Sequence, residues 1–221
     1  DIVQLLPAML RKAPKVIAKL SPMLDLSHTL ALLPQTTDVH VVSVKNECKE
    51  LLFVLRRGNA AKIPRIHCIN IMTDSSEQAF CFTPAEEQAT PVLPAKSAGA
   101  YLYEPNASIL KAGAYKQTAL RTGVRKLHVN SHLYTSDEEV FDFPGRSFRI
   151  EEVLPFSGKI CRTIARNIPQ ANLTVRNFPL SVEELRKRTK ITDGGEIYLF
   201  ATTLADNQKV LIRCTKLSQF P

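Results

Sequence analysis

The densest basic segment of the chain lies close to its C-terminus and reads Arg186-Lys187-Arg188-Thr189-Lys190. Lysine and arginine can neutralise phosphate groups, and the counterions that are then released give affinity for a polyanion whatever its sequence. Three further basic residues, Lys159, Arg162 and Arg166, recur at the spacing of one helical face. Basic residues in a last helical turn also complement the helix dipole, so the run at 186–190 has a structural alternative. We predict one shared basic surface with these members: Lys159, Arg162, Arg166, Arg186, Lys187, Arg188 and Lys190.

The distribution of charge along the chain favours a surface of this kind. The chain has 221 residues and a formal net charge of +8. Residues 1–105 carry 11 basic and 10 acidic side chains, whereas residues 106–221 carry 18 basic and 11 acidic ones. A basic half in a chain with a pI near 9.3 is typical of a polyanion-binding surface. The alternative is that the basic residues only keep the protein soluble, and net charge does not separate the two interpretations.

A second candidate site lies where the apolar segment 15–20, which has the length of a strand, ends. In open α/β sheets, ligands bind just outside the carboxyl ends of the strands. Four residues at this point are therefore predicted to border a cleft: Lys19, Ser21, Pro22 and Asp25. The alternative is a plain loop between a strand and a helix.

Other chemistry has little support in the residue pattern. No glycine-rich phosphate loop, G-x-S-x-G elbow or H-E-x-x-H motif occurs. His128 and His132 are four residues apart, but no cysteine or carboxylate stands at ligand spacing, so we expect no metal site. The other three histidines are predicted to be single packing residues. Tyr198 and Phe200 lie on one face of a predicted strand and could stack on bases, although core packing is the favoured interpretation.

The composition is that of an ordinary globular protein. Hydrophobic residues make up 44% and charged residues 23%, which excludes a disordered, collagen-like or coiled-coil chain. No apolar segment approaches the roughly 20 residues of a membrane span, so we expect no membrane association. Five cysteines without a C-x-x-C pair argue against a disulfide framework and favour a reducing, cytoplasmic compartment.

The first hundred residues alternate between helical and strand-like patterns. Helices are predicted at residues 2–10 and 24–33. Strands are predicted at residues 15–20, 39–44, 63–72 and 78–82. Asp25 or Ser27 would cap the second helix, and residues 47–57 fit either a strand or a short helix. This series suits one half of an open, mainly parallel α/β sheet. Residues 83–99, which are rich in proline, are predicted to be a linker without a helix or a central strand.

The end of the chain has the clearest pattern. Short helices are predicted at residues 106–115 and 116–122, and a strand at residues 127–134. Further strands are predicted at residues 148–156, 173–178, 196–204 and 209–216. Ser157 is a candidate cap for a helix with Ile160, Ile164 and Ile168 on one face, and Ser181 begins a capping-box pattern for a second helix. The resulting order is βαβαββ, a small α+β sandwich with both helices on one face of the sheet.

Several segments, taken in their order along the chain, resemble one protein family. Residues 16–25, Val-Ile-Ala-Lys-Leu-Ser-Pro-Met-Leu-Asp, look like the fifth strand and following loop of a class I S-adenosylmethionine-dependent methyltransferase. In particular, the chain is similar to a bacterial group that carries a THUMP-like domain at its C-terminus. The segments that extend this likeness are residues 101–105, 133–137, 148–156 and 182–188.

The resemblance implies three parts. Residues 1–96 would be the C-terminal half of a doubly wound, Rossmann-like methyltransferase sheet, residues 97–147 a ferredoxin-like module, and residues 148–221 a THUMP-like domain. The family's glycine-rich cofactor loop and acidic motif would precede Asp1. The chain is therefore expected to be a piece of a longer enzyme, inactive alone and without bound S-adenosylmethionine. THUMP domains bind structured RNA, so the resemblance implies an RNA partner, with tRNA and rRNA as the candidates.

Two functional hypotheses follow. In the first, the parent protein methylates RNA, and the basic THUMP-like domain binds or presents the substrate through phosphate contacts. In the second, the C-terminal part is a protein-interaction or packing module, and the parent methylates a protein or a small molecule. Affinity for structured RNA separates the two hypotheses. The sequence assigns neither catalytic residues nor an oligomeric state.

Overall fold

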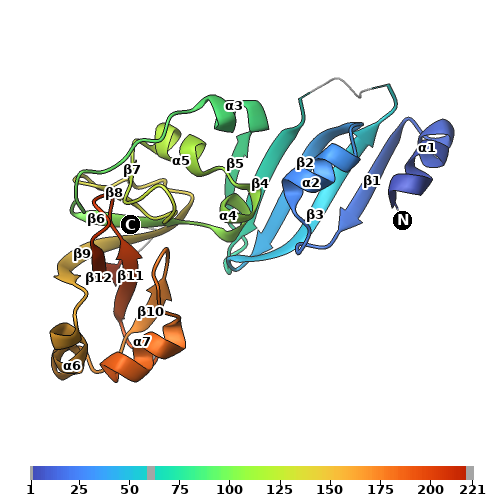
Figure 1. Cartoon of the computed structure of the whole chain (residues 1–221). Coiled ribbons are helices and arrows are strands. Elements are labelled where there is room, and N and C mark those ends of the chain that lie inside the picture. Colours follow the sequence, from blue (N-terminus) through green and yellow to red (C-terminus); the bar gives the residue numbers. More distant parts are fainter. Residues whose placement is uncertain (1, 59–62, 218–221) are drawn as a thin grey trace. The chain divides into compact units, whose positions relative to one another are not determined.

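The computed structural model describes residues 2–58 and 63–217, and the chain divides into two compact units (Figure 1). The first unit consists of residues 1–91 together with 106–117, and the second of residues 92–105 together with 118–221. The segment 106–117 thus packs with the first unit although it follows part of the second unit in the sequence. As a consequence, the predicted ferredoxin-like module contributes residues to both units.

The first unit is built on a five-stranded sheet. Its strands are β1 (Lys15–Leu20), β2 (Thr36–Val44), β3 (Glu47–Arg56), β4 (Arg65–Ile71) and β5 (Glu77–Phe82). They are arranged in the order β1-β3-β2-β4-β5, and of these four neighbouring pairs of described strands β2–β4 alone is parallel. The prediction of a mainly parallel sheet is therefore wrong for the described part of this unit.

A short connection explains the antiparallel pair β2–β3. Lys45 and Asn46 both have positive φ, 51° and 62°, as in the two-residue turns that join antiparallel strands. The turn leads directly back along β2, so residues 47–56 form a strand and the helical alternative is wrong. A parallel pair needs a crossover of about a dozen residues or more, which β2 and β4 obtain because β3 lies between them in the chain.

Helices cover one face of this sheet. α1 (Ile2–Lys12), α2 (Leu26–Leu32) and α4 (Ala107–Ala112) place apolar side chains in the same core as the inward residues of the strands. Asp25 is the cap of α2, since its carboxylate accepts a hydrogen bond from the His28 N–H at 2.7 Å. The core includes Leu6, Leu33, Val39, Phe53 and Ile109.

The predicted linker contains a helix, α3 (Pro84–Ala89), so that part of the prediction is wrong. Thr83 and Glu86 form a complete capping box, in which each side chain binds the backbone N–H of the other residue. Pro84 occupies a first-turn position, where a missing N–H group costs nothing. Proline thus starts this helix, whereas the pattern of prolines had suggested that no helix could form.

The second unit contains a seven-stranded sheet (Figure 1). Its strands are β6 (Tyr101–Pro105), β7 (Arg125–Lys126), β8 (Tyr134–Ser136), β9 (Gly145–Pro155), β10 (Asn172–Val175), β11 (Ile197–Thr203) and β12 (Lys209–Lys216). The strands are arranged in the order β10-β11-β12-β9-β6-β8-β7. Along the chain, β5 of the first unit is followed by α3 and then by β6. Because β9 pairs with both β12 and β6, the strands of the predicted ferredoxin-like and THUMP-like parts form one continuous sheet. The predicted division between residues 147 and 148 falls inside β9.

The C-terminal elements follow the predicted βαβαββ order. α6 (Gly158–Asn167) lies between β9 and β10, and α7 (Val182–Thr189) lies between β10 and the hairpin β11–β12. Ser157 caps α6, and Ser181 with Glu184 forms a capping box at α7, as the pattern predicts. Both helices contribute to one apolar cluster on the same sheet face, with members that include Ile164, Ile168, Leu185, Leu199 and Leu211.

The predicted strand at residues 127–134 is wrong. The flanks of this segment belong to β7 and β8, and a turn lies between them. The N–H group of Ser131 donates to the carbonyl oxygen of His128 at 3.2 Å, and His132 adopts a left-handed φ of 51°. Asn130 and Ser131 are residues that favour turns, and they outweigh the alternation of apolar residues around them.

Candidate nucleic-acid interface

α6 presents a basic face to solvent. Lys159, Arg162 and Arg166 are exposed, whereas Cys161 and Ile164 on the opposite side of the same helix are buried. The helix begins at Ser157, whose hydroxyl group accepts a hydrogen bond from the Ile160 N–H at 3.3 Å. The amphipathic pattern and its cap thus place all three basic side chains on one exposed side, as predicted.

α7 adds a second group of exposed basic residues beside the first. Lys187, Arg188 and Lys190 are exposed at the C-terminal end of α7, while Leu185 and Thr189 are buried. α6 and α7 pack against each other, so the two groups lie on neighbouring helices. We call the set the α6–α7 basic surface: Lys159, Arg162, Arg166, Lys187, Arg188 and Lys190.

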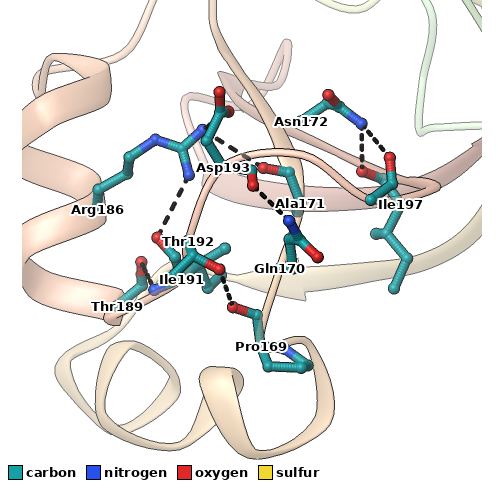
Figure 2. Close-up of polar contacts among 11 residues, drawn as sticks. Pro169, Gln170, Ala171, Asn172, Arg186, Thr189, Ile191, Thr192, Asp193 and Ile197 are labelled. Atoms are coloured by element: carbon teal, nitrogen blue, oxygen red, sulfur yellow. Dashed lines mark hydrogen bonds and ion pairs between the residues drawn. The ribbon is translucent and has the colours of Figure 1, made fainter.

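Arg186 has a different role from its neighbours (Figure 2). Its guanidinium group forms an ion pair with Asp193 and donates hydrogen bonds to the carbonyl oxygens of Ile191 at 3.3 Å and Ala171 at 3.4 Å. These contacts hold the loop after α7 against the segment that leads into β10. We therefore assign Arg186 a structural role and leave it out of the α6–α7 basic surface.

The two aromatic residues of β11 belong to the core. Phe200 is fully buried and packs edge-on against Phe148, with ring centroids 4.9 Å apart. Tyr198 packs against the same ring at 5.0 Å. The core-packing interpretation is therefore confirmed, and these rings are not platforms on which bases could stack.

The predicted cleft-bordering residues have local partners in the first unit. Lys19 forms an ion pair with Glu50 at 3.1 Å, and the Ser21 hydroxyl accepts a hydrogen bond from the Met23 N–H at 3.2 Å. Asp25 is the cap of α2, and Pro22 is half-buried. A cavity of about 610 Å³ in this unit is lined by residues of α2 and α3, among others, and by none of these four. The structure gives this corner the geometry of a strand-to-helix loop.

Two histidines that are far apart in the sequence meet on the first sheet. His40 of β2 and His67 of β4 are register partners across the parallel pair, and their rings stack with centroids 4.6 Å apart. His67 Nε2 lies 3.1 Å from a carboxylate oxygen of Asp38. Burial and the neighbouring His67 lower the pKa of His40. The two histidines are far apart in the sequence, and only the pairing of β2 with β4 brings them together. The sequence alone therefore predicted no pair here.

The other pair, His128 and His132, lies in the turn before β8. Burial is the main reason that the pKa of His132 falls to about 4, and the charges of Lys126 and Arg176 lower it further. His132 is thus neutral near pH 7. Within residues 2–58 and 63–217, no group of three or more histidine, cysteine, aspartate or glutamate side chains could hold a metal ion.

The second unit contains a buried carboxylate. Glu104 of β6 is 2% exposed and forms ion pairs with Arg146 of β9 and with Arg176, which follows β10. Arg146 Nε donates to one carboxylate oxygen at 3.0 Å, and Arg176 Nη2 lies 2.8 Å from the other. The sequence carries no signal for this cluster, since its members are separated by dozens of residues. Its position between strands indicates a stabilising role.

Comparisons with known families agree with the architecture of the second unit. Residues 145–216 match a THUMP domain-like family. The chain carries a THUMP-like domain. Residues 101–144 match a ferredoxin-like domain family, so the boundary between the two matched segments lies where β9 begins. The α6–α7 basic surface belongs to the THUMP-like domain.

One solved structure resembles nearly the whole chain. It is that of a protein from Porphyromonas gingivalis W83 described as a "putative methyltransferase", with 44% sequence identity and a TM-score of 0.92. The similarity covers 99% of this chain and 55% of that one, so the chain spans about half the length of its relative. No curated protein matches the sequence. Together, these likenesses support a chain with a ferredoxin-like and a THUMP-like domain. Among the described residues, every helix is too short or too polar to cross a membrane.

Proposed function

We propose that this chain is part of a class I, S-adenosylmethionine-dependent methyltransferase that acts on structured RNA. The observation that carries the proposal is the likeness, at 44% identity over 99% of the chain, to the Porphyromonas protein. In this proposal the first unit completes the catalytic sheet, and the THUMP-like domain binds the RNA.

The edge of the first sheet supports a larger catalytic domain. Within the described residues, β1 is an edge strand that pairs with β3 alone. Ile17 of this strand is 59% exposed, and Met23 in the loop after it is 87% exposed. An open strand edge beside exposed apolar side chains is a place where further strands can add. We propose that the other half of a Rossmann-like sheet joins at β1.

The proposal assigns S-adenosylmethionine to that other half. The glycines described in the first unit are Gly58 after β3 and Gly113 at the end of α4, and neither lies between a strand and the start of a helix. The described residues of the first unit therefore do not fit a cofactor loop of the usual kind. We propose that residues 1–221 alone transfer no methyl group. We also propose that the parent protein works in the cytoplasm.

The α6–α7 basic surface supports RNA as the substrate. Its six residues are exposed cations, and exposed cations bind the phosphate backbone of nucleic acids through counterion release. The aromatic residues of β11 pack on Phe148 in the core, so this surface is suited to phosphates rather than to stacked bases. Phosphates line any nucleic-acid helix, and the THUMP-like domain that carries this surface favours structured RNA.

Binding of a hairpin RNA at several salt concentrations tests the proposal. The triple variant Lys187→Ala, Arg188→Ala, Lys190→Ala should weaken binding and reduce the salt slope by about one unit for each lost phosphate contact. A matched control is Lys96→Ala, Arg125→Ala, Lys216→Ala, which removes the same charge from exposed positions outside α6 and α7. Equal effects of the two triple variants would contradict the proposed surface. If the unmutated chain did not bind RNA, the C-terminal part would instead be interpreted as a protein-interaction module.

A further inference from the structure

The loop between α7 and β11, residues 190–196, is held by Gln170, which precedes β10, and by Asn172, the first residue of β10 (Figure 2). Gln170 Nε2 donates to the carbonyl oxygen of Asp193 at 2.6 Å, and Asn172 Nδ2 donates to that of Gly195 at 2.6 Å. These bonds use the backbone carbonyl groups of the loop as acceptors. The two side chains therefore tie the loop to residues 170–172.

Two glycines in this loop have backbone N–H groups without a hydrogen-bond partner among the described residues. Gly194 and Gly195 have φ of +97° and +77°, a region that side chains make unfavourable. Gly195 is exposed and Gly194 half-exposed, and within the described residues neither N–H group forms a hydrogen bond. Free backbone N–H groups are common donors to phosphate oxygens. They follow Lys190, a member of the α6–α7 basic surface, by a few residues.

Asp193 is an unexpected residue at this place. Its side chain is 82% exposed, and a carboxylate beside a cationic surface repels phosphate. Arg186 neutralises this charge through the ion pair and, with its two bonds to backbone carbonyl oxygens, ties the loop to its neighbours. The pair therefore adds no net charge to the surface, which points to a role in shaping the loop.

We propose that the backbone of Gly194 and Gly195 binds an RNA phosphate group beside the α6–α7 basic surface, and that Arg186 and Asp193 position the loop that contains these glycines. This inference rests on the proposed function, because it requires that the basic surface binds RNA. It differs from a purely electrostatic account in one respect. In our account, the conformation of the loop, and not its charge, determines how tightly the loop binds the phosphate group.

The variant Asp193→Asn separates the two accounts, since it removes a negative charge and also breaks the ion pair. If charge alone matters, hairpin RNA should bind more tightly. If the loop must be positioned, binding should weaken about fivefold, the effect of losing about one ordinary hydrogen bond, with little change in the salt slope. The matched control is Glu183→Gln, which makes the same charge change at the exposed start of α7. It should leave binding unchanged or slightly tighter.

A second variant carries no change of charge. Gln170→Ala removes the amide that holds the Asp193 carbonyl, and it should also weaken RNA binding while thermal unfolding shows the chain still folded. Tighter binding by Asp193→Asn, or unchanged binding by Gln170→Ala, would overturn the inference. The triple variant of α7 distinguishes failure of the loop proposal from failure of the proposed function. If that variant weakens binding and the loop variants do not, the loop proposal fails alone, and if none weakens binding, the proposed function fails as well.

Discussion

At the scale of single residues, the buried charge of Glu104 in the second unit needs ion-pair partners to be stable. Its carboxylate is 2% exposed and depends on Arg146 and Arg176 for compensation. Buried charges without partners are strongly destabilising, whereas paired ones can be close to neutral. Each member of the cluster is therefore sensitive to the loss of the others.

Glu104→Gln should lower the free energy of unfolding by about 2 to 4 kcal/mol, because two arginines would then share a site without an anion. Urea denaturation measures this change. Glu152→Gln, an exposed glutamate on β9, is the matched control and should cost less than about 0.5 kcal/mol. Similar costs for both variants would show that the buried ion pairs contribute little.

His132 should make stability depend on pH. Its pKa is about 4 in the folded chain and 6.5 for an ordinary histidine, so between these values the unfolded chain binds a proton that the folded chain does not. Stability should therefore fall as the pH is lowered from about 6.5 to 4, by at most about 1.4 kcal/mol per pH unit and less where solvent screens the charge. Urea denaturation at several pH values, compared with His132→Gln, checks this. A wild-type profile parallel to that of the variant would contradict it.

At the scale of elements, a capping box decides where α7 begins. The Ser181 hydroxyl accepts a hydrogen bond from the Glu184 N–H at 3.2 Å, and the Glu184 carboxylate accepts one from the Ser181 N–H at 2.8 Å. The capping box also places acidic residues at the start of α7 and leaves the basic ones for its end, in accord with the helix dipole.

Ser181→Ala should destabilise the second unit by about 1 kcal/mol, because it leaves the Glu184 N–H without its acceptor. Ser181→Asp keeps an acceptor oxygen at the same place and should be close to neutral. Thermal unfolding of the three proteins measures both effects. If Ser181→Asp were as destabilising as Ser181→Ala, the cap would not be the reason.

α4 shows how an element joins one unit although its neighbours in the sequence belong to the other. Asn106 caps α4 and also donates from Nδ2 to the Gln78 side chain of β5 at 3.1 Å. Asn46 Oδ1, in the turn between β2 and β3, accepts a hydrogen bond from the Ala107 N–H at 2.7 Å. Side-chain amides thus fix the start of this short helix on the first sheet.

At the scale of the whole molecule, substrate binding and methyl transfer should be separable. We expect residues 1–221 to bind hairpin RNA and to show neither calorimetric binding of S-adenosylmethionine nor methylation of that RNA, because the proposed cofactor site lies outside them. Binding measurements with each ligand check this. Tight binding of S-adenosylmethionine by this chain would contradict the proposed division of labour.

Local pattern was sufficient for much of the second unit. The βαβαββ order, the caps at Ser157 and Ser181, and the exposed basic faces of α6 and α7 all depend on periodicity and on residues within one turn of each other. The same reasoning placed β1 at residues 15–20. It missed α3 because three prolines outweighed the capping-box spacing of Thr83 and Glu86.

What the sequence by itself determined about this protein is therefore the type of most elements, the concentration of charge near the C-terminus and a likeness to methyltransferases with THUMP-like domains. The tertiary structure alone decided the strand directions of the first sheet, the ion pairs of Glu104 and the inward turn of Arg186 toward Asp193. Helix periodicity and caps act between neighbours in the chain, so a sequence displays them. Strand pairing and the partners of a long charged side chain depend on residues that only folding brings together.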